Sequence, residues 1–149
     1  MTDYILTSLN MRQHVKGIFC DLTKAFDCVN HEILLTKLHY YGIRGVCWNW
    51  FKTYITNRKQ KVQIISQSSI QDSICKWETI KSGVPQGSIL GPLLFVVYMN
   101  DLPSGVNHLT SPIIYADDTS VLFSDKYLEV KFNITLNHIT DWFSINGLT

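Results

Sequence analysis

Apolar and polar positions alternate along the chain in runs that predict short strands and amphipathic helices. Residues 15–22 form a short apolar run that is typical of a strand buried on both faces. Apolar side chains then recur at helical spacing over 33–41, with Asp27 or Asn30 as the N-cap and Gly42 as the stop. The first part of the chain therefore predicts a strand followed by a helix.

The middle of the chain predicts a second helix, a turn and two strands. In chain order these are 47–56 for the helix, 57–60 for the turn, and 61–65 and 74–81 for the strands. A Gly-Val-Pro-Gln-Gly loop at 83–87 then leads into a helix from near Ser88 to near Asp101. Because this helix is apolar around most of its circumference, we expect it to pack in the interior.

The last third predicts a hairpin and a long helix. Two β-rich runs, 112–116 and 119–123, flank the pair Asp117-Asp118, and apolar side chains at helical spacing follow over 126–146. The order of strand, two helices, strands, helix, hairpin and helix belongs to the α+β class. We expect a small antiparallel sheet packed against helices.

Composition allows one domain and excludes several classes of protein. The 149 residues are 46% hydrophobic and 17% charged, with a formal charge of +1 that gives no sign of a nucleic-acid partner. The N-terminus does not have the pattern of a secretory signal, and the longest apolar run, 89–99, is too short to span a bilayer. We expect an intracellular protein, nuclear or cytoplasmic, not secreted and without a membrane partner. The four cysteines lack a Cys-x-x-Cys pair and predict buried, reduced thiols.

The pair Asp117-Asp118 is the first candidate for chemistry. Adjacent carboxylates at a hairpin tip repel one another, and a cation or hydrogen bonds would hold them there. Asp21 ends an apolar strand, where an unpaired charge is unfavourable. The two positions could share a pair of Mg²⁺ ions, with Asp117 the better placed of the two turn residues. The alternatives are a soluble polar turn for the pair and a helix cap or strand end for Asp21.

Three blocks of the sequence, taken together, resemble the reverse transcriptases. They are Phe-Cys-Asp-Leu-Thr-Lys-Ala-Phe-Asp at 19–27, Ser-Gly-Val-Pro-Gln-Gly-Ser-Ile-Leu-Gly-Pro at 82–92 and Tyr-Ala-Asp-Asp at 115–118. The residues in these blocks, together with Asn-Asp-Leu at 100–102, are similar to those of the non-LTR retrotransposon branch, and of jockey-like elements in particular. The resemblance extends over nearly the whole chain and implies a palm-like polymerase domain over 1–149.

The resemblance implies a role for several residues. Asp21, Asp117 and Asp118 would hold two catalytic Mg²⁺ ions, with Mn²⁺ as a possible substitute. Phe26 would be the steric gate that favours deoxyribonucleotides, although core packing is the plain alternative. Gln86 and Gly87 would lie against the incoming nucleotide. The implied partners are an RNA template, a DNA primer and a dNTP, and the sequence does not indicate the oligomeric state.

A basic segment follows the second predicted helix. Arg58, Lys59 and Lys61, after several aromatic residues, suit contacts with nucleic-acid phosphates, although core aromatics followed by a solvated basic turn are the stronger explanation. The resemblance also implies missing parts: residues 1–14 would be the end of a fingers region, and the thumb would lie beyond Thr149. We therefore expect this fragment to be inactive alone. The alternative is a catalytically dead retrotransposon remnant with weak nucleic-acid binding.

Overall fold

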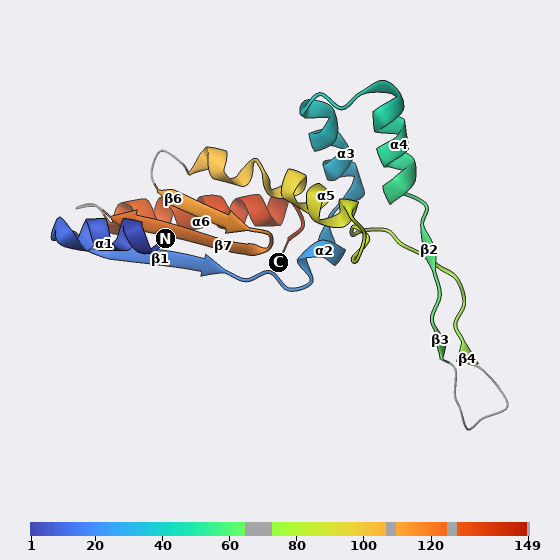
Figure 1. Cartoon of the computed structure of the whole chain (residues 1–149), viewed down its shortest axis with the longest axis horizontal. Coiled ribbons are helices and arrows are strands. Elements are labelled where there is room, and N and C mark those ends of the chain that lie inside the picture. Colours follow the sequence, from blue (N-terminus) through green and yellow to red (C-terminus); the bar gives the residue numbers. More distant parts are fainter. Residues whose placement is uncertain (65–72, 107–109, 125–127, 149) are drawn as a thin grey trace.

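The computed structural model describes residues 1–64, 73–106, 110–124 and 128–148. A three-stranded antiparallel sheet lies at its centre, made of β1 (Val15–Cys20), β7 (Asp118–Ser124) and β6 (Ser111–Tyr115) in that order. β6 and β7 form a hairpin, and β1 pairs with the other edge of β7. Helices and sheet together confirm the predicted α+β class (Figure 1).

One long helix covers one face of this sheet. The long helix α6 (Leu128–Ile145) packs on β7, with the rings of Phe132 and Phe123 5.7 Å apart. On the same face Val121 is buried, and it lies beside Ile18 of β1. On the opposite face Phe19 is 67% exposed, because no helix of the described residues covers that end of the sheet. The prediction that this first strand is buried on both faces is therefore wrong.

Three further helices, one of them short, lie beside the sheet. The short α2 (Ala25–Cys28) leads into α3 (His31–Tyr40), and α4 (Gly45–Ile55) packs against α3. Asn30 is the N-cap of α3, since its side chain accepts hydrogen bonds from two backbone N–H groups. Gly42 has φ of 92° and ends that helix. The predicted helices are confirmed, and Asn30 rather than Asp27 is the cap.

The helix α5 (Leu90–Met99) packs against α3 and continues into a 3-10 turn, η1 (Leu102–Gly105). Its residues Phe95 and Tyr98 are fully buried, whereas Leu93 and Val96 are each about half exposed. The prediction of a wholly interior helix is therefore wrong on one side. Within the described residues, no element covers that side.

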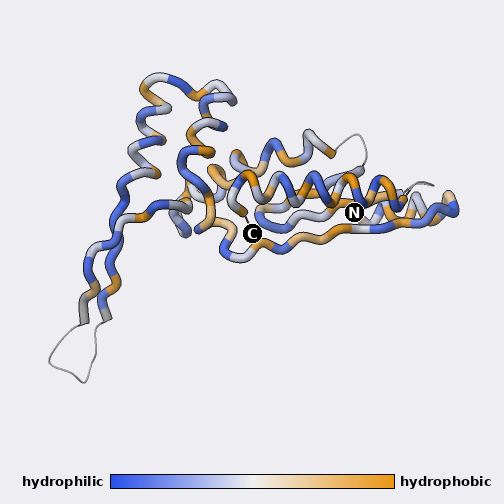
Figure 2. The backbone as a smooth tube through the Cα atoms, turned by 180° about the vertical axis from the view of Figure 1, so that it is seen from behind, coloured by the Kyte–Doolittle hydropathy of each residue, from blue (hydrophilic) through white to orange (hydrophobic). Residues whose placement is uncertain are grey.

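A two-stranded ribbon extends from the end of α4. Its pairs are β2 (Lys59–Gln60) with β5 (Glu78–Thr79), and β3 (Gln63–Ile64) with β4 (Ser73–Ile74). Gln60 pairs with Glu78 and Gln63 with Ile74, so the returning strand holds one extra residue, which is a β-bulge. The ribbon projects away from the rest of the structure and is largely hydrophilic (Figures 1 and 2).

The ribbon replaces the two strands that the sequence predicts at 61–65 and 74–81. The direction of the chain is as expected, but the bulge divides each strand into two short pieces. Residue 65 lies outside the described part of the chain. The helix α1 (Thr2–Asn10), which packs against β1, was not predicted at all.

The four cysteines are free, as expected, but only partly covered. Cys20 and Cys28 are half-buried, and Cys47 and Cys75 are exposed. The predicted burial is wrong for Cys47, on the outer side of α4, and for Cys75, on the ribbon. None of the helices in the described ranges is long and apolar enough to cross a membrane.

Candidate active site

Three acidic side chains lie at one end of the central sheet. Asp21 follows the last residue of β1, and that residue, Cys20, pairs with Thr119 of β7. Asp21 and Asp118 are the next residues beyond this pair on the two chains, so both lie at the same end of the sheet. Asp117 precedes Asp118 in the turn. Residues distant in sequence are thus brought together by strand pairing.

The hairpin turn that carries these residues is tight. Tyr115 pairs with Asp118, which leaves Ala116 and Asp117 as the turn. Ala116 has φ of 54°, an uncommon value for a residue with a side chain. The predicted hairpin with an acidic tip is confirmed. The sequence favours Asp117 as the metal-facing residue, whereas Asp118 is the residue next to the Cys20–Thr119 pair, as Asp21 is on the other strand.

The donor atoms at this end of the sheet fit a hard divalent cation. Asp21 and Asp118 are exposed and Asp117 is half-buried, so their oxygen atoms are open to an ion and its water. Among the described residues no group of three or more His, Cys, Asp or Glu side chains is gathered around one point. Mg²⁺ commonly takes only one or two protein carboxylates and completes its shell with water and phosphate oxygens. Burial raises the pKa of the neighbouring Cys20 thiol, which therefore stays neutral.

Phe26 lies on α2, a few residues beyond Asp21. Its ring stacks on that of Phe95 in α5, with centroids 4.5 Å apart and planes 23° from parallel. The ring is half-buried, so one part is held by the core and another part faces outward. Lys24, with φ of 53°, begins the helix and turns the chain sharply after β1. Phe26 is thus held against α5, in the segment that follows Asp21.

The loop at 82–87 is fastened to α2 along its length. Gly83 N–H donates to Val29 O at 2.8 Å, and Val84 N–H donates to Phe26 O at 2.9 Å. Gly83 has φ of 88°, and a Cβ atom there would lie 2.9 Å from the Asp27 Cα atom. Only glycine therefore allows this approach.

The fastening places Gln86 against Asp27. The Gln86 side-chain amide donates to Asp27 Oδ1 at 2.9 Å, and both side chains are exposed. Gly87, with φ of 77°, has open space around it. The first two sequence blocks are therefore side by side in space, and the third lies at the adjoining end of the sheet.

Comparison with known proteins identifies the family of this chain. The family described as reverse transcriptase (RNA-dependent DNA polymerase) matches residues 5–149. The chain belongs to the reverse transcriptase family. The predicted resemblance to non-LTR retrotransposon elements, including jockey, is also confirmed.

Three relatives from Drosophila melanogaster give the scale of the similarity. The chain is 32% identical over 136 residues to the probable RNA-directed DNA polymerase from transposon BS, covering 83% of this chain and 14% of that protein. It is 29% identical over 138 residues to the probable RNA-directed DNA polymerase from transposon X-element, covering 85% and 13%. It is 31% identical over 133 residues to the RNA-directed DNA polymerase from mobile element jockey, covering 85% and 14%. The chain thus spans about a seventh of the length of these relatives.

In this reverse transcriptase chain, a cavity of about 680 Å³ lies between the loop and the base of the ribbon. Its lining is mostly polar and includes Asp27, Gln86, Arg58, Gln60 and Lys81. Such a volume accommodates a nucleotide-sized ligand. Of the predicted basic residues, only Arg58 lines this cavity, because Lys59 and Lys61 lie further out on the ribbon and are exposed.

Two side chains converge on one carbonyl group of the loop. His31 Nε2 donates to Gly83 O at 2.8 Å, and Arg58 Nη2 lies 3.5 Å from the same oxygen. The Arg58 Nε atom is buried without a hydrogen-bond partner. His31 is buried at the start of α3, which explains how the loop keeps its place relative to that helix.

Sequence reasoning missed Asp27 and His31 as part of this site. Asp27 was assigned no role beyond a possible helix cap, and His31 was given none. Both hold the loop at 82–87, Asp27 through Gln86 and His31 through Gly83. The position of Asp27 inside the first block was the available signal, whereas no pattern in the sequence distinguishes His31.

Proposed function

We propose that the chain is the palm-like, nucleotide-transferring core of an RNA-directed DNA polymerase. The primer 3′-oxygen attacks the α-phosphorus of a dNTP, a P–O bond forms to the primer, and the bond to pyrophosphate breaks. The hydroxyl proton passes to water in this step. The observation that supports the proposal best is the pairing of Cys20 with Thr119, because Asp21 and Asp118 are the next residues on the two strands at that end of the sheet. Because these substrates are found inside cells, we expect the reaction to take place in the nucleus or cytoplasm.

Asp21, Asp117 and Asp118 would hold two Mg²⁺ ions, or Mn²⁺ in their place. When bound, such ions neutralise the charge that develops on the attacking and leaving oxygens. The carboxylates contribute by lying at one end of a paired sheet, where their separation is fixed before substrate arrives. This fixed geometry is the part of catalysis that these residues supply.

Phe26, Gln86 and Gly87 would surround the nucleotide. A ring held by Phe95 cannot retreat from a ribose 2′-hydroxyl, and this would favour deoxyribose. Gln86 is oriented by Asp27 and would donate or accept at the nucleotide, while the absent side chain of Gly87 lets the backbone approach. RNA template and DNA primer are the partners that this reaction requires.

The test uses a full-length reverse transcriptase in which this chain replaces the matching residues, which we call the parent protein. Primer extension on an RNA template is measured for Asp117→Ala, with Asp3→Ala, an exposed aspartate in the first turn of α1, as the matched control. We expect product to fall at least about a thousandfold in the first variant, because one charged ligand is lost, and to stay unchanged in the control. Normal extension by the Asp117→Ala protein would overturn the proposal.

A further inference from the structure

The ribbon carries much more positive charge than the rest of the chain. Residues 58–81 contain five Lys and Arg against two acidic residues, a formal charge of +3, although the whole chain carries only +1. The remainder is therefore net negative. The basic residues of the ribbon are Arg58, Lys59, Lys61, Lys76 and Lys81. The four lysines are exposed, and only Arg58 is half-buried.

A tryptophan lies exposed among these charges. Trp77 is 62% exposed on the returning strand, and the ammonium group of Lys61 lies 5.1 Å from the centre of its ring. Single exposed apolar side chains are common on proteins, so it is the position of this ring among the lysines that suits stacking on a base. Trp77 lies within the β-bulge, a feature that redirects side chains on a ribbon.

Backbone pairing gives the ribbon a defined shape without help from a core. Ile80 N–H donates to Arg58 O at 2.8 Å, and Cys75 N–H donates to Val62 O at 2.9 Å. The charged side chains are thus attached to a paired framework that extends into solvent, as Figures 1 and 2 show. A charged, extended surface of this kind suits a long polyanion better than a compact ligand.

We propose that this ribbon, residues 58–64 and 73–81, binds single-stranded RNA. Lys59, Lys61 and Lys76 contact phosphates, and Trp77 stacks on an unpaired base. A single strand is the fitting partner because a base within a duplex does not offer its face to the ring. The choice of RNA rests on the proposed function.

The base of the ribbon borders the polar cavity, which could receive one end of the bound RNA strand. The 680 Å³ cavity is lined there by Arg58, Gln60 and Lys81 from the ribbon and by Gln86 from the loop. A strand that follows the basic residues inward reaches the loop that is fastened to α2 and Phe26. The acidic groups Asp27 and Glu78 also line the cavity, so phosphates bind along the outer lysines and a base occupies the polar interior.

The experiment measures binding of the 149-residue chain to a fluorescein-labelled single-stranded RNA of 20 nucleotides by anisotropy over a series of salt concentrations. Trp77→Ala removes the stacking ring and should weaken binding about tenfold or more. The triple variant Lys59→Gln, Lys61→Gln, Lys76→Gln should make the salt dependence shallower by about two units of slope. Trp77→Phe keeps a ring and should recover most of the affinity.

Matched controls lie outside the ribbon. Trp50→Ala removes another tryptophan, 52% exposed on α4, and Arg44→Gln removes an exposed charge before that helix; both should bind RNA as the unchanged chain does. Thermal melting confirms that each variant folds. Equal weakening by Trp50→Ala, an unchanged salt slope in the triple variant, or equal binding of a duplex RNA would each overturn the inference.

The two proposals can fail separately. In the parent protein, Asp117→Ala should abolish primer extension and leave RNA affinity intact. Trp77→Ala should weaken RNA binding and raise the template concentration needed for half-maximal extension. Loss of extension with normal RNA binding in Trp77→Ala would overturn the ribbon inference alone.

Discussion

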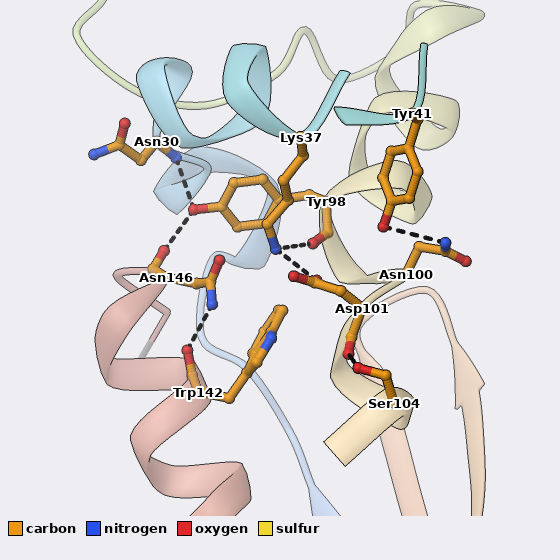
Figure 3. A network of polar contacts seen from close by, with 9 residues as sticks. All are labelled: Asn30, Lys37, Tyr41, Tyr98, Asn100, Asp101, Ser104, Trp142 and Asn146. Atoms are coloured by element: carbon orange, nitrogen blue, oxygen red, sulfur yellow. Dashed lines mark hydrogen bonds and ion pairs between the residues drawn. The ribbon is translucent and has the colours of Figure 1, made fainter. Parts of the chain in front are cut away.

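Replacing Lys37 with methionine tests how the helices around the site are held together. Lys37 reaches from α3 to the C-terminal end of α5, where its ammonium group donates to Tyr98 O at 2.7 Å and to Asp101 Oδ1 at 2.6 Å (Figure 3). It also lies 4.5 Å from the ring centre of Trp142 in α6. One side chain, only 12% exposed, therefore joins three helices.

The expected loss follows from these contacts. Tyr98 O is one of the last carbonyls of α5, and without Lys37 it loses its donor, a change of about 1 kcal/mol. The ion pair adds less than about 1 kcal/mol because the Asp101 side chain is 43% exposed. The two ring contacts add about 1 kcal/mol. Relief of the buried charge offsets part of this, leaving a net loss of about 2 kcal/mol for Lys37→Met.

Urea unfolding and thermal melting measure this loss. About 2 kcal/mol corresponds to a lower melting temperature by about 4 to 8 °C in a chain of this length. Asp101→Asn is the matched control, since an amide oxygen still accepts from Lys37, and it should lower stability by less than about 1 kcal/mol. The reasoning is refuted if Asp101→Asn destabilises as much as Lys37→Met, or if Lys37→Met has no effect.

The pH dependence gives the same prediction a second readout. Burial lowers the pKa of Lys37 from its ordinary 10.5, and the hydrogen bond and charge of Asp101 only partly oppose this. As pH rises through the lowered value, the folded chain releases this proton before the unfolded chain does. The unfolded state then binds more protons, so stability rises with pH up to about 10.5. Lys37→Met should lack this rise, and the difference in stability between the two proteins should widen at alkaline pH.

Three further predictions concern packing and selectivity. Gly91→Ala should destabilise by about 2 kcal/mol or more in urea unfolding, because the new Cβ would lie 2.3 Å from Pro85 O; an unchanged midpoint would contradict this. Tyr98→Phe should cost about 1 to 2 kcal/mol, since its hydroxyl donates to the buried Asn146 O at 2.6 Å, and a neutral result would mean that water replaces the hydroxyl. In the parent protein, Phe26→Val should lower the discrimination between dNTP and rNTP at least about tenfold, measured by single-nucleotide incorporation. Unchanged discrimination would mean that Phe26 serves only to pack the core.

Local pattern was enough to predict the elements whose signals are contained in a few residues. The hairpin at 111–124 has two β-rich runs around a polar turn, and α3 has a capping asparagine and a terminal glycine. The long helix α6 was also predicted, because its apolar positions recur over 18 residues. Each of these signals is local.

The failures concern partners that are distant in sequence. Whether one face of β1 is covered depends on which helices return to it, so the exposure of Phe19 could not be predicted from the run at 15–22. The bulge in the ribbon depends on the register between two segments, and periodicity within either one does not contain it. The contact between Asp27 and Gln86 has the same origin, because 59 positions separate the two residues.

The hydroxyl group of Tyr98 explains why such distant partners can still form one site. It accepts weakly from Asn30 N–H at 3.4 Å and donates to Asn146 O at 2.6 Å, so it joins the start of α3 to the end of α6 (Figure 3). The start of α3 also holds the loop through His31, and α6 packs on the strand that begins with Asp118. The loop at 82–87 and the acidic end of the sheet are therefore both connected, through α3 and α6, to the same buried tyrosine. The loop and the acidic residues are thus connected through a buried contact of the core, in addition to the exposed segment between Asp21 and Phe26. A reaction that depends on the positions of its groups requires such a rigid connection.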